Sequence, residues 1–284
     1  MHCIKSILAE ATDALTLVSD SALLDAEILL CQTLNQPRSH LRAWPDKPLL
    51  PEHLAAFRAL LEQRQQGIPI AYITGNREFW SRDFQVSPDV LIPRPDTELL
   101  IELSLKLIPA DEPVKIIDLG TGSGIIAITL AAERPHAQIS ATDFSLAALR
   151  IARLNADKHH INTIQFYQSN WFADVPATQF NLIISNPPYI AEDDSHLQQG
   201  DVRFEPQTAL RAAEQGLGDI KIIADAARSY LEPRGHLLIE HGYDQRQQVQ
   251  TLFKNLHYDN VQTYTDLSGQ PRVTYGQFMS GYPV

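Results

Sequence analysis

The feature that most restricts the fold of this chain is the alternation of strand-like and helix-like segments after Asp111. Short apolar runs predict strands, and the segments between them suit helices, the first ending before Pro135 and the second beginning at Ser145. This alternation is typical of a parallel sheet with helices on both faces. The predicted strands are Val114–Leu119, Gln138–Thr142, Ile164–Tyr167, Phe180–Ile184 and His236–Glu240, and a later antiparallel edge pair is Val261–Thr265 with Arg272–Phe278.

The first third of the chain has the pattern of a small helical bundle. An apolar stripe over Ile7–Val18 fits one helix, and a second can begin after Asp20 or Ser21. Another helix fits between Pro51, a favourable first residue, and Gly67, a typical stop. We therefore expect these helices to pack as one domain.

The segment between the helices and the sheet is expected to be a hairpin. Apolar and polar residues alternate over Ala71–Gly75, Arg77–Trp80 and Phe84–Val86. Asp96 can cap a helix that runs to Ile108. The expected domains are a helical domain over residues 1–69, a hairpin linker over 70–95 and a sheet domain over 96–284.

A glycine-rich turn follows the first predicted strand and consists of Gly120, Thr121, Gly122, Ser123 and Gly124. Glycines permit a tight turn and let a ligand lie against bare backbone, and the following helix start offers unpaired N–H groups. The spacing GxGxG differs from the GxGxxG of dinucleotide-binding folds. Asp118, just before this turn, can serve the ligand or only hydrogen-bond the loop.

Two residues on later strands extend this candidate cofactor site. Asp143 ends the second strand at about the distance from the glycines expected of a ribose-binding carboxylate. A cap for the next helix is the competing role, but Ser145 could provide that cap. Trp171 follows the third strand, where it could stack on or flank an adenine ring, although an aromatic residue at a strand end can also belong to the core.

The segment Asn186-Pro187-Pro188-Tyr189 directly follows a predicted strand. Two prolines cannot continue a hydrogen-bonded ladder, so the chain leaves the sheet in a rigid extended turn. The Asn side chain and nearby carbonyls can accept hydrogen bonds from a planar NH2 group, and the Tyr ring can cover its face. These residues predict a site for a conjugated nitrogen, such as an amide or an exocyclic base amine. A plain proline turn would not explain the Asn and the Tyr.

Composition excludes several classes of protein. The 284 residues are 44% hydrophobic and 20% charged, as in soluble globular proteins, and the net charge of -11 argues against binding nucleic acid through its phosphates. Cys3 and Cys31 form no disulfide framework. No signal-like segment is present, and the apolar stretch Gly124–Ala132 is shorter than the roughly 20 residues of a membrane span. We expect a cytoplasmic protein without membrane or direct nucleic-acid binding.

The glycine turn, Asp143 and the Asn-Pro-Pro-Tyr segment together resemble class I S-adenosylmethionine-dependent methyltransferases that act on amino groups. Further segments are similar to the PrmC/HemK family over essentially the whole chain: Tyr72–Gly75, Arg77–Trp80, Leu91–Glu98 and Asp201–Pro206. Members of that family methylate the glutamine amide in the GGQ tripeptide of peptide-chain release factors. The resemblance implies an α/β fold, namely a Rossmann-like seven-stranded sheet with one antiparallel strand, preceded by a helical bundle and a hairpin linker.

The resemblance also implies roles for individual residues. S-adenosyl-L-methionine would be the cofactor and class 1 release factors, through their GGQ loop, the partners of a monomeric enzyme. The expected catalytic residues are Asn186, Pro187 and Tyr189, and Pro188 joins them in binding the substrate. The Asn186 side chain and the Pro187 carbonyl would accept the amide protons while Tyr189 packs against the flat amide. The expected cofactor-binding residues are Gly120, Thr121, Gly122, Ser123, Gly124, Asp143, Trp171 and Asn186.

Some residues keep more than one interpretation. Thr97, with Asp96, can cap a helix, although the resemblance places both near the cofactor. Arg203 and Glu205 could support the site or form an ion pair with each other. No metal is required for the chemistry, and His159-His160 suits a solvated helix end rather than a metal site.

Three other functions fit the sequence less well. An adenine-N6 methyltransferase would use Asn-Pro-Pro-Tyr equally well, but it predicts a basic region that this acidic chain lacks. A non-catalytic module that scaffolds release factors would not need an intact Asn186. An NAD-dependent dehydrogenase disagrees with the glycine spacing.

Overall fold

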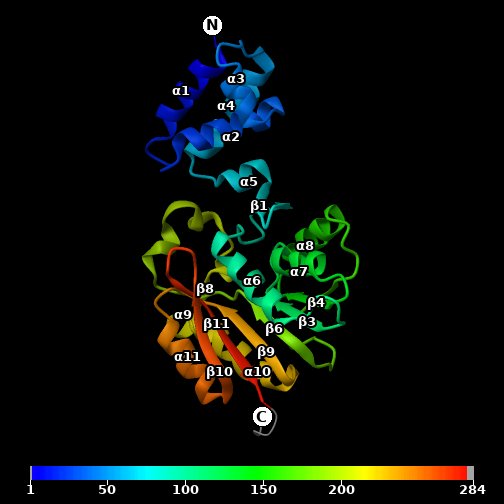
Figure 1. The fold of residues 1–284 in the computed structure, drawn as a ribbon. Coiled ribbons are helices and arrows are strands. Elements are labelled where there is room, and N and C mark those ends of the chain that lie inside the picture. Colours follow the sequence, from blue (N-terminus) through cyan, green and yellow to red (C-terminus); the bar gives the residue numbers. More distant parts are fainter. Residues whose placement is uncertain (1, 280–284) are drawn as a thin grey trace. The chain divides into compact units, whose positions relative to one another are not determined.

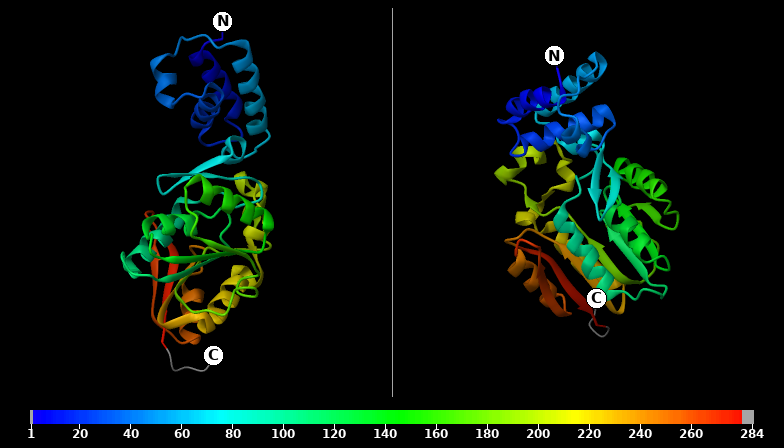
Figure 2. Two further views of the ribbon diagram at one scale, coloured as in Figure 1. Left: turned by 90° about the vertical axis from the view of Figure 1, so that its right-hand side faces the viewer. Right: turned by 45° about the horizontal axis from the view of Figure 1, so that its top comes forward.

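The computed structural model describes residues 2–279, which divide into two compact units (Figure 1; Figure 2). The first unit contains the residues up to Asn76 together with Gln198–Phe204, and the second contains Arg77–Leu197 and the residues from Glu205 onward. Gln198–Phe204 thus folds with the first unit, although the chain on both sides of it belongs to the second.

The first unit is a bundle of helices, as predicted. Buried residues of the first helix recur at helical spacing, with Ile4, Ile7, Ala11 and Leu15 packing into one core that includes Phe57. The elements are α1 (Ile4–Leu15), α2 (Ala22–Leu34), α3 (Arg38–Ala43), α4 (Pro51–Gln65) and α5 (Ile70–Thr74). Pro51 begins α4, and Gly67 follows its end with a φ of +89°, so both predicted boundary signals are confirmed.

The predicted strand over Ala71–Gly75 is wrong, because α5 occupies Ile70–Thr74. A pattern of five residues is too short to distinguish a strand from a helix of about one and a half turns. The hairpin instead consists of β1 (Asn76–Phe79) and β2 (Arg82–Gln85), which overlap the predicted segments Arg77–Trp80 and Phe84–Val86.

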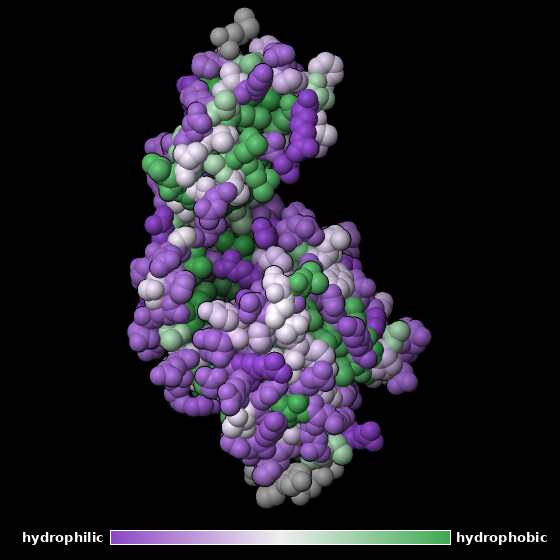
Figure 3. Space-filling model, turned by 60° about the vertical axis from the view of Figure 1, so that its left-hand side comes forward, coloured by the Kyte–Doolittle hydropathy of each residue, from purple (hydrophilic) through white to green (hydrophobic). Residues whose placement is uncertain are grey.

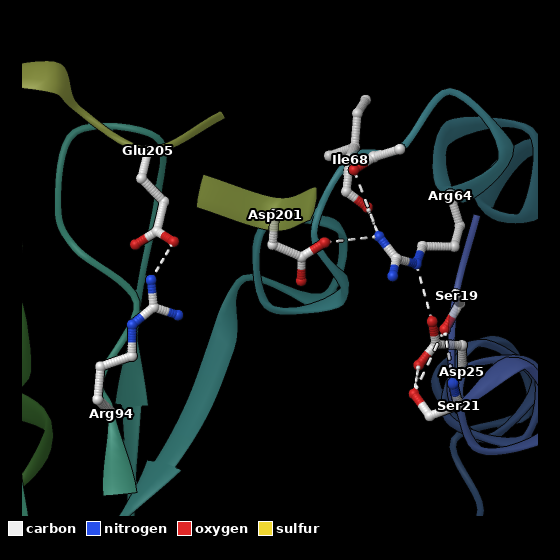
Figure 4. Close-up of polar contacts among 9 residues, drawn as sticks. Ser19, Ser21, Asp25, Arg64, Ile68, Arg94, Asp201 and Glu205 are labelled. Carbon is white, nitrogen blue, oxygen red and sulfur yellow. Dashed lines mark hydrogen bonds and ion pairs between the residues drawn. The ribbon is translucent and has the colours of Figure 1, made fainter. Parts of the chain in front are cut away.

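A buried arginine fixes Gln198–Phe204 to the helices of the first unit (Figure 4). Arg64 is 6% exposed, and its Nε donates to Asp25 at 2.8 Å while its Nη1 donates to Asp201 at 2.9 Å. Gly67 lacks a side chain at the place where Arg203 packs, since a Cβ there would lie 2.0 Å from the guanidinium. A buried cation needs such partners, and the two carboxylates provide them.

The second unit is built on a seven-stranded sheet in the order β10-β11-β9-β6-β3-β4-β5. Its strands are β3 (Lys115–Leu119), β4 (Gln138–Asp143), β5 (Gln165–Gln168), β6 (Phe180–Ser185), β9 (Leu231–Glu240), β10 (Tyr258–Thr265) and β11 (Pro271–Phe278). All seven predicted strands are present within a few residues at their ends. β11 runs antiparallel to both neighbours, and the predicted edge pair forms with β10 outermost and β11 inside.

Helices cover both faces of the sheet. The adjacent β3 residues Ile116 and Ile117 point to opposite faces and enter separate cores. Ile116 lies in the core with Ile101 and Ile128, and Ile117 lies in the core with Ile220. The helices are α6 (Glu98–Leu107), α7 (Ile125–Glu133), α8 (Leu146–Lys158), α9 (Ala213–Gly216), α10 (Gly218–Tyr230) and α11 (Arg246–Asn255).

A long excursion follows β6. The short parallel strands β7 (Ile190–Ala191) and β8 (Arg211–Ala212) pair at its base. Between them lie the 3-10 helices η2 (Ser195–Gln198), η3 (Gly200–Phe204) and η4 (Gln207–Ala209), and η1 (Pro95–Thr97) precedes α6. The excursion therefore begins directly after Asn-Pro-Pro-Tyr and contains the segment that folds with the first unit.

Figure 3 shows hydrophilic residues over most of the face in view, with apolar residues gathered in several patches. No helix among residues 2–279 combines the length and the apolar character that crossing a bilayer requires.

Candidate active site

The predicted site residues meet because three neighbouring parallel strands end at one edge of the sheet. β3 lies between β4 and β6, so the glycine turn, Asp143 and Asn186 follow adjacent strand ends. The Ser185 hydroxyl donates to the Leu119 carbonyl at 2.8 Å and ties the ends of β6 and β3 together.

A cavity of about 410 Å³ opens at this edge, within the range of small-molecule sites. The predicted residues that line it are Gly120, Thr121, Gly122, Ser123, Asp143, Trp171, Asn186 and Pro188. Of the other predicted residues, Gly124, Pro187 and Tyr189 are outside the lining.

The glycines have different roles within the turn. Gly120 has a φ of +73°, and a Cβ on it would lie 3.2 Å from the Trp171 ring, so bare backbone is needed there. Gly124 is the N-cap of α7 and has a φ of +86°, and a Cβ there would meet Ile128 at 2.8 Å and Ala152 at 3.2 Å. Gly124 therefore serves the packing of α7 against α8, while Gly120 and Gly122 face the cavity.

Asp143 holds the glycine turn and lines the cavity at the same time. Its Oδ2 accepts from the Gly122 amide at 2.9 Å, and its Oδ1 accepts from the Ser145 amide at 2.8 Å. The Ser145 hydroxyl accepts from Ala148 and caps α8, so the cap does not depend on Asp143. Each carboxylate oxygen has a further lone pair, which leaves capacity for two ligand hydroxyls. Burial raises the pKa of Asp143.

Asp118 is buried below the turn and supports it. Its Oδ2 accepts from the Thr121 hydroxyl at 2.6 Å, and the Ala127 amide is a second donor. Burial raises its pKa to about 7 against the effect of these hydrogen bonds. Asp118 does not line the cavity, and its contacts account for a structural role.

Two aromatic side chains flank the cavity. Trp171 packs on the core next to β6, and its side chain hydrogen-bonds Asp219, which also lines the cavity. Phe144 lines the cavity while 71% exposed, and sequence reasoning missed it. The available signal was an aromatic residue directly after the strand-end acid Asp143.

Only some residues of the Asn-Pro-Pro-Tyr segment face the cavity. Asn186 and Pro188 line the cavity, and Pro187 is buried. The Tyr189 hydroxyl lies 3.4 Å from Oε1 of Glu240, and the Gln245 side chain donates to the Tyr189 carbonyl at 2.9 Å. Burial raises the pKa of Tyr189, so its hydroxyl stays protonated.

The residues before α6 contact the site but do not cap the helix as expected. Asp96 lies inside the 3-10 turn η1 and forms an ion pair with Arg272 at 3.0 Å, so its predicted capping role is wrong. Thr97 occupies the cap position without a side-chain cap hydrogen bond. Its hydroxyl accepts from Nδ2 of Asn186 at 3.2 Å instead.

Glu205 supports one wall of the cavity. The buried carboxylate forms an ion pair with Arg94 (Figure 4) and accepts from the Ile92 amide at 3.0 Å. Arg94 and Pro93 line the cavity. Glu205 therefore fixes the extended segment that carries them.

The two histidines at the end of α8 are not both solvated, contrary to the prediction from sequence. His160 is exposed, but the ring of His159 lies 4.9 Å from that of Phe84 and hydrogen-bonds the Asp83 carbonyl at 3.0 Å. Burial lowers the pKa of His159.

Comparisons with known proteins identify the family. The PrmC N-terminal domain model matches residues 6–75, and the methyltransferase small domain model matches residues 96–202. Release factor glutamine methyltransferase from Shewanella oneidensis is 46% identical over 277 residues, which cover 98% of this chain and 96% of the relative. The Vibrio cholerae protein of that name is 50% identical over 261 residues, 92% of this chain and 91% of the relative. The chain belongs to the release factor glutamine methyltransferase family.

Membership of this family confirms the resemblance seen in the sequence. A crystal structure of a methyltransferase from Pyrococcus furiosus is 15% identical, with a TM-score of 0.54 over 78% of this chain and 98% of that one. That likeness supports the methyltransferase fold of the sheet unit. In this member of the release factor glutamine methyltransferase family, the sheet edge described above carries the candidate active site.

Proposed function

We propose that this protein transfers a methyl group from S-adenosylmethionine to the side-chain amide nitrogen of the glutamine in the GGQ tripeptide of class 1 release factors. The observation that carries the proposal is Asn186, which lines one cavity together with the glycine turn and Asp143. The residues proposed to bind the cofactor and the amide thus line one cavity, and the relatives named release factor glutamine methyltransferase support the substrate class.

The residues of the cavity fit S-adenosylmethionine. Gly120 and Gly122 offer bare backbone, Asp143 offers acceptors for ribose hydroxyls, and Trp171 and Phe144 offer aromatic faces to a base. When bound, the cofactor supplies an activated methyl group on a sulfonium.

The chain's own contribution is to hold the substrate amide. An amide nitrogen shares its lone pair with its carbonyl and is a poor nucleophile. In the proposed arrangement, Oδ1 of Asn186 and the Pro187 carbonyl accept its two protons, which stabilises positive charge developing on the nitrogen and fixes its direction. The Tyr189 ring would pack against the flat amide, and Pro188 would complete the substrate contact.

The remaining parts of the proposal concern partner and location. The helical domain over residues 1–69 would hold the release factor, residues 70–95 would link, and residues 96–284 would carry catalysis. The net charge of -11 supports a protein substrate rather than nucleic acid. We propose a monomeric, cytoplasmic enzyme.

The direct test of the site is Asn186→Ala, assayed for methyl transfer and for cofactor affinity separately. Methyl transfer should fall by about 100-fold or more, because an acceptor that acts on developing charge is lost, and cofactor affinity should change much less. Asn181→Ala is a matched control, since Asn181 lies at the other end of β6 and accepts from the Lys115 amide. Near-wild-type transfer by Asn186→Ala would refute this role.

A further inference from the structure

The proposed role of Asn186 depends on which end of its amide faces the substrate. Oδ1 can accept a substrate N–H, whereas the NH2 end would oppose it with a second donor. The two ends have the same shape, so only hydrogen-bond partners can select the productive orientation.

Thr97, which also lines the cavity, is the hydrogen-bond partner of this amide. Its hydroxyl lies 3.2 Å from Nδ2 of Asn186, and the Thr97 residue is 1% exposed. A hydroxyl can donate or accept, so Thr97 alone would tolerate either end of the Asn186 amide. The orientation is decided by the group that takes the hydroxyl hydrogen of Thr97.

Glu240 is that group. It is 1% exposed at the end of β9, and its carboxylate interacts with the side chains of Thr97 and Tyr189. Oε2 of Glu240 has no hydrogen-bond partner among residues 2–279, so this oxygen has the capacity to accept the hydroxyl hydrogen of Thr97. An ionised carboxylate only accepts, so it draws the Thr97 hydrogen and leaves the Thr97 oxygen to accept from Asn186.

We propose that Thr97 and Glu240 are positioning residues for methyl transfer, which fix the Asn186 side chain with Oδ1 toward the substrate nitrogen. This inference rests on the proposed function and assigns two residues, on η1 and β9, to the same site. Neither residue needs to touch the reacting atoms, because both act through Asn186.

The charge of Glu240 makes this arrangement depend on pH. The groups that face it are Arg272 on β11, Asp96 on η1 and Tyr189 after β6, and burial outweighs the opposing contacts to raise its pKa to about 7. Below that pH a protonated Glu240 can donate to Thr97, whose hydroxyl is then free to donate to Oδ1 of Asn186. The amide would turn its NH2 end to the substrate.

The first experiment compares Thr97→Val, Thr97→Ser and wild type with a release factor and S-adenosylmethionine as substrates. In Thr97→Val, kcat should fall by about 10- to 100-fold, the effect of one oriented hydrogen bond, while KM and cofactor affinity stay within about twofold. Thr97→Ser restores the hydroxyl and should retain kcat within about threefold. Thr129→Val controls for the loss of a buried hydroxyl, because Thr129 lies inside α7 and its hydroxyl has no hydrogen-bond partner in the described chain.

The second experiment measures kcat against pH in Glu240→Gln, which stays neutral at every pH. The wild-type rate should fall as pH decreases through about 7, and the variant should lose this acid limb and be slower at about pH 8.5. Because this experiment does not use Thr97→Val, it tests the inference even where that variant folds poorly.

The outcomes separate the inference from the function on which it rests. Three results with an active wild type would overturn the inference alone. They are an unchanged kcat in Thr97→Val, equal losses of kcat in Thr97→Ser and Thr97→Val, and a pH profile of Glu240→Gln identical to that of the wild type. A wild type that methylates no release factor would overturn the proposed function as well.

Discussion

At the scale of single residues, Asp143 illustrates how one side chain serves both structure and ligand. Its carboxylate accepts from Gly122 and Ser145 and still lines the cavity. Asp143→Ala should weaken S-adenosylmethionine binding by about 10-fold or more, because hydrogen bonds to a charged acceptor are lost. Isothermal titration calorimetry measures this, with the exposed Asp157 on α8 replaced by Ala as the control. Unchanged affinity would mean that Asp143 serves only the backbone.

Two buried acids should affect stability with pH. The pKa values of Asp118 and Glu240 are raised to about 7, chiefly by burial, so the folded protein binds these protons more tightly than the unfolded chain. Their contribution to the free energy of unfolding is therefore lost as pH rises from about 4 to about 7, by on the order of a few kcal/mol each.

Neutral replacements test this dependence. The double variant Asp118→Asn, Glu240→Gln should lose less stability than wild type between about pH 5 and pH 8 in urea unfolding, since the replaced groups no longer titrate. The same pH dependence in both proteins would show that neither carboxyl has the raised pKa described here.

At the scale of elements, the ion pair between Arg64 and Asp201 links the segment Gln198–Phe204 to α4. Asp201 is 43% exposed on its side chain, so Asp201→Asn should cost under about 1 kcal/mol overall. It should nevertheless open the segment locally and speed trypsin cleavage after the exposed Arg203 several-fold, as detected by mass spectrometry. Asp193→Asn, an exposed change in the same excursion, is the control.

Replacing Arg64, the cation of this ion pair, should lower the stability of the protein more than replacing Asp201. Arg64→Met would leave Asp25 buried without its cation, at a cost of roughly 3 kcal/mol or more. Unaltered cleavage in Asp201→Asn, or an Arg64→Met protein as stable as wild type, would contradict the account of this ion pair.

The strands of the sheet were predictable because each is a local apolar run between clear boundaries. Elements without that local signal were not. The five residues of α5 lack a full helical period, and the capping expectation for Asp96 failed because Arg272, far along the chain, takes its carboxylate. The site residues that sequence identified are those with special backbone or chemistry, such as Gly120 and Asn186.

At the scale of the whole molecule, what sequence could not reveal is contact between distant residues. Arg64 and Asp201 are 137 positions apart, and their ion pair places Gln198–Phe204 in the unit formed by the first helices. Thr97 and Glu240 likewise come together at Asn186 only in the folded sheet unit. The proposed domain limits of 1–69, 70–95 and 96–284 follow local composition and could not anticipate either contact.

Methyl transfer to a glutamine amide can be detected by mass spectrometry of a GGQ-containing release factor after incubation with this protein and S-adenosylmethionine. We expect a mass gain of one methylene on the GGQ glutamine, and we expect no gain when Asn186→Ala replaces the wild type. Methylation of nucleic acid with an unmodified release factor would contradict the proposed function.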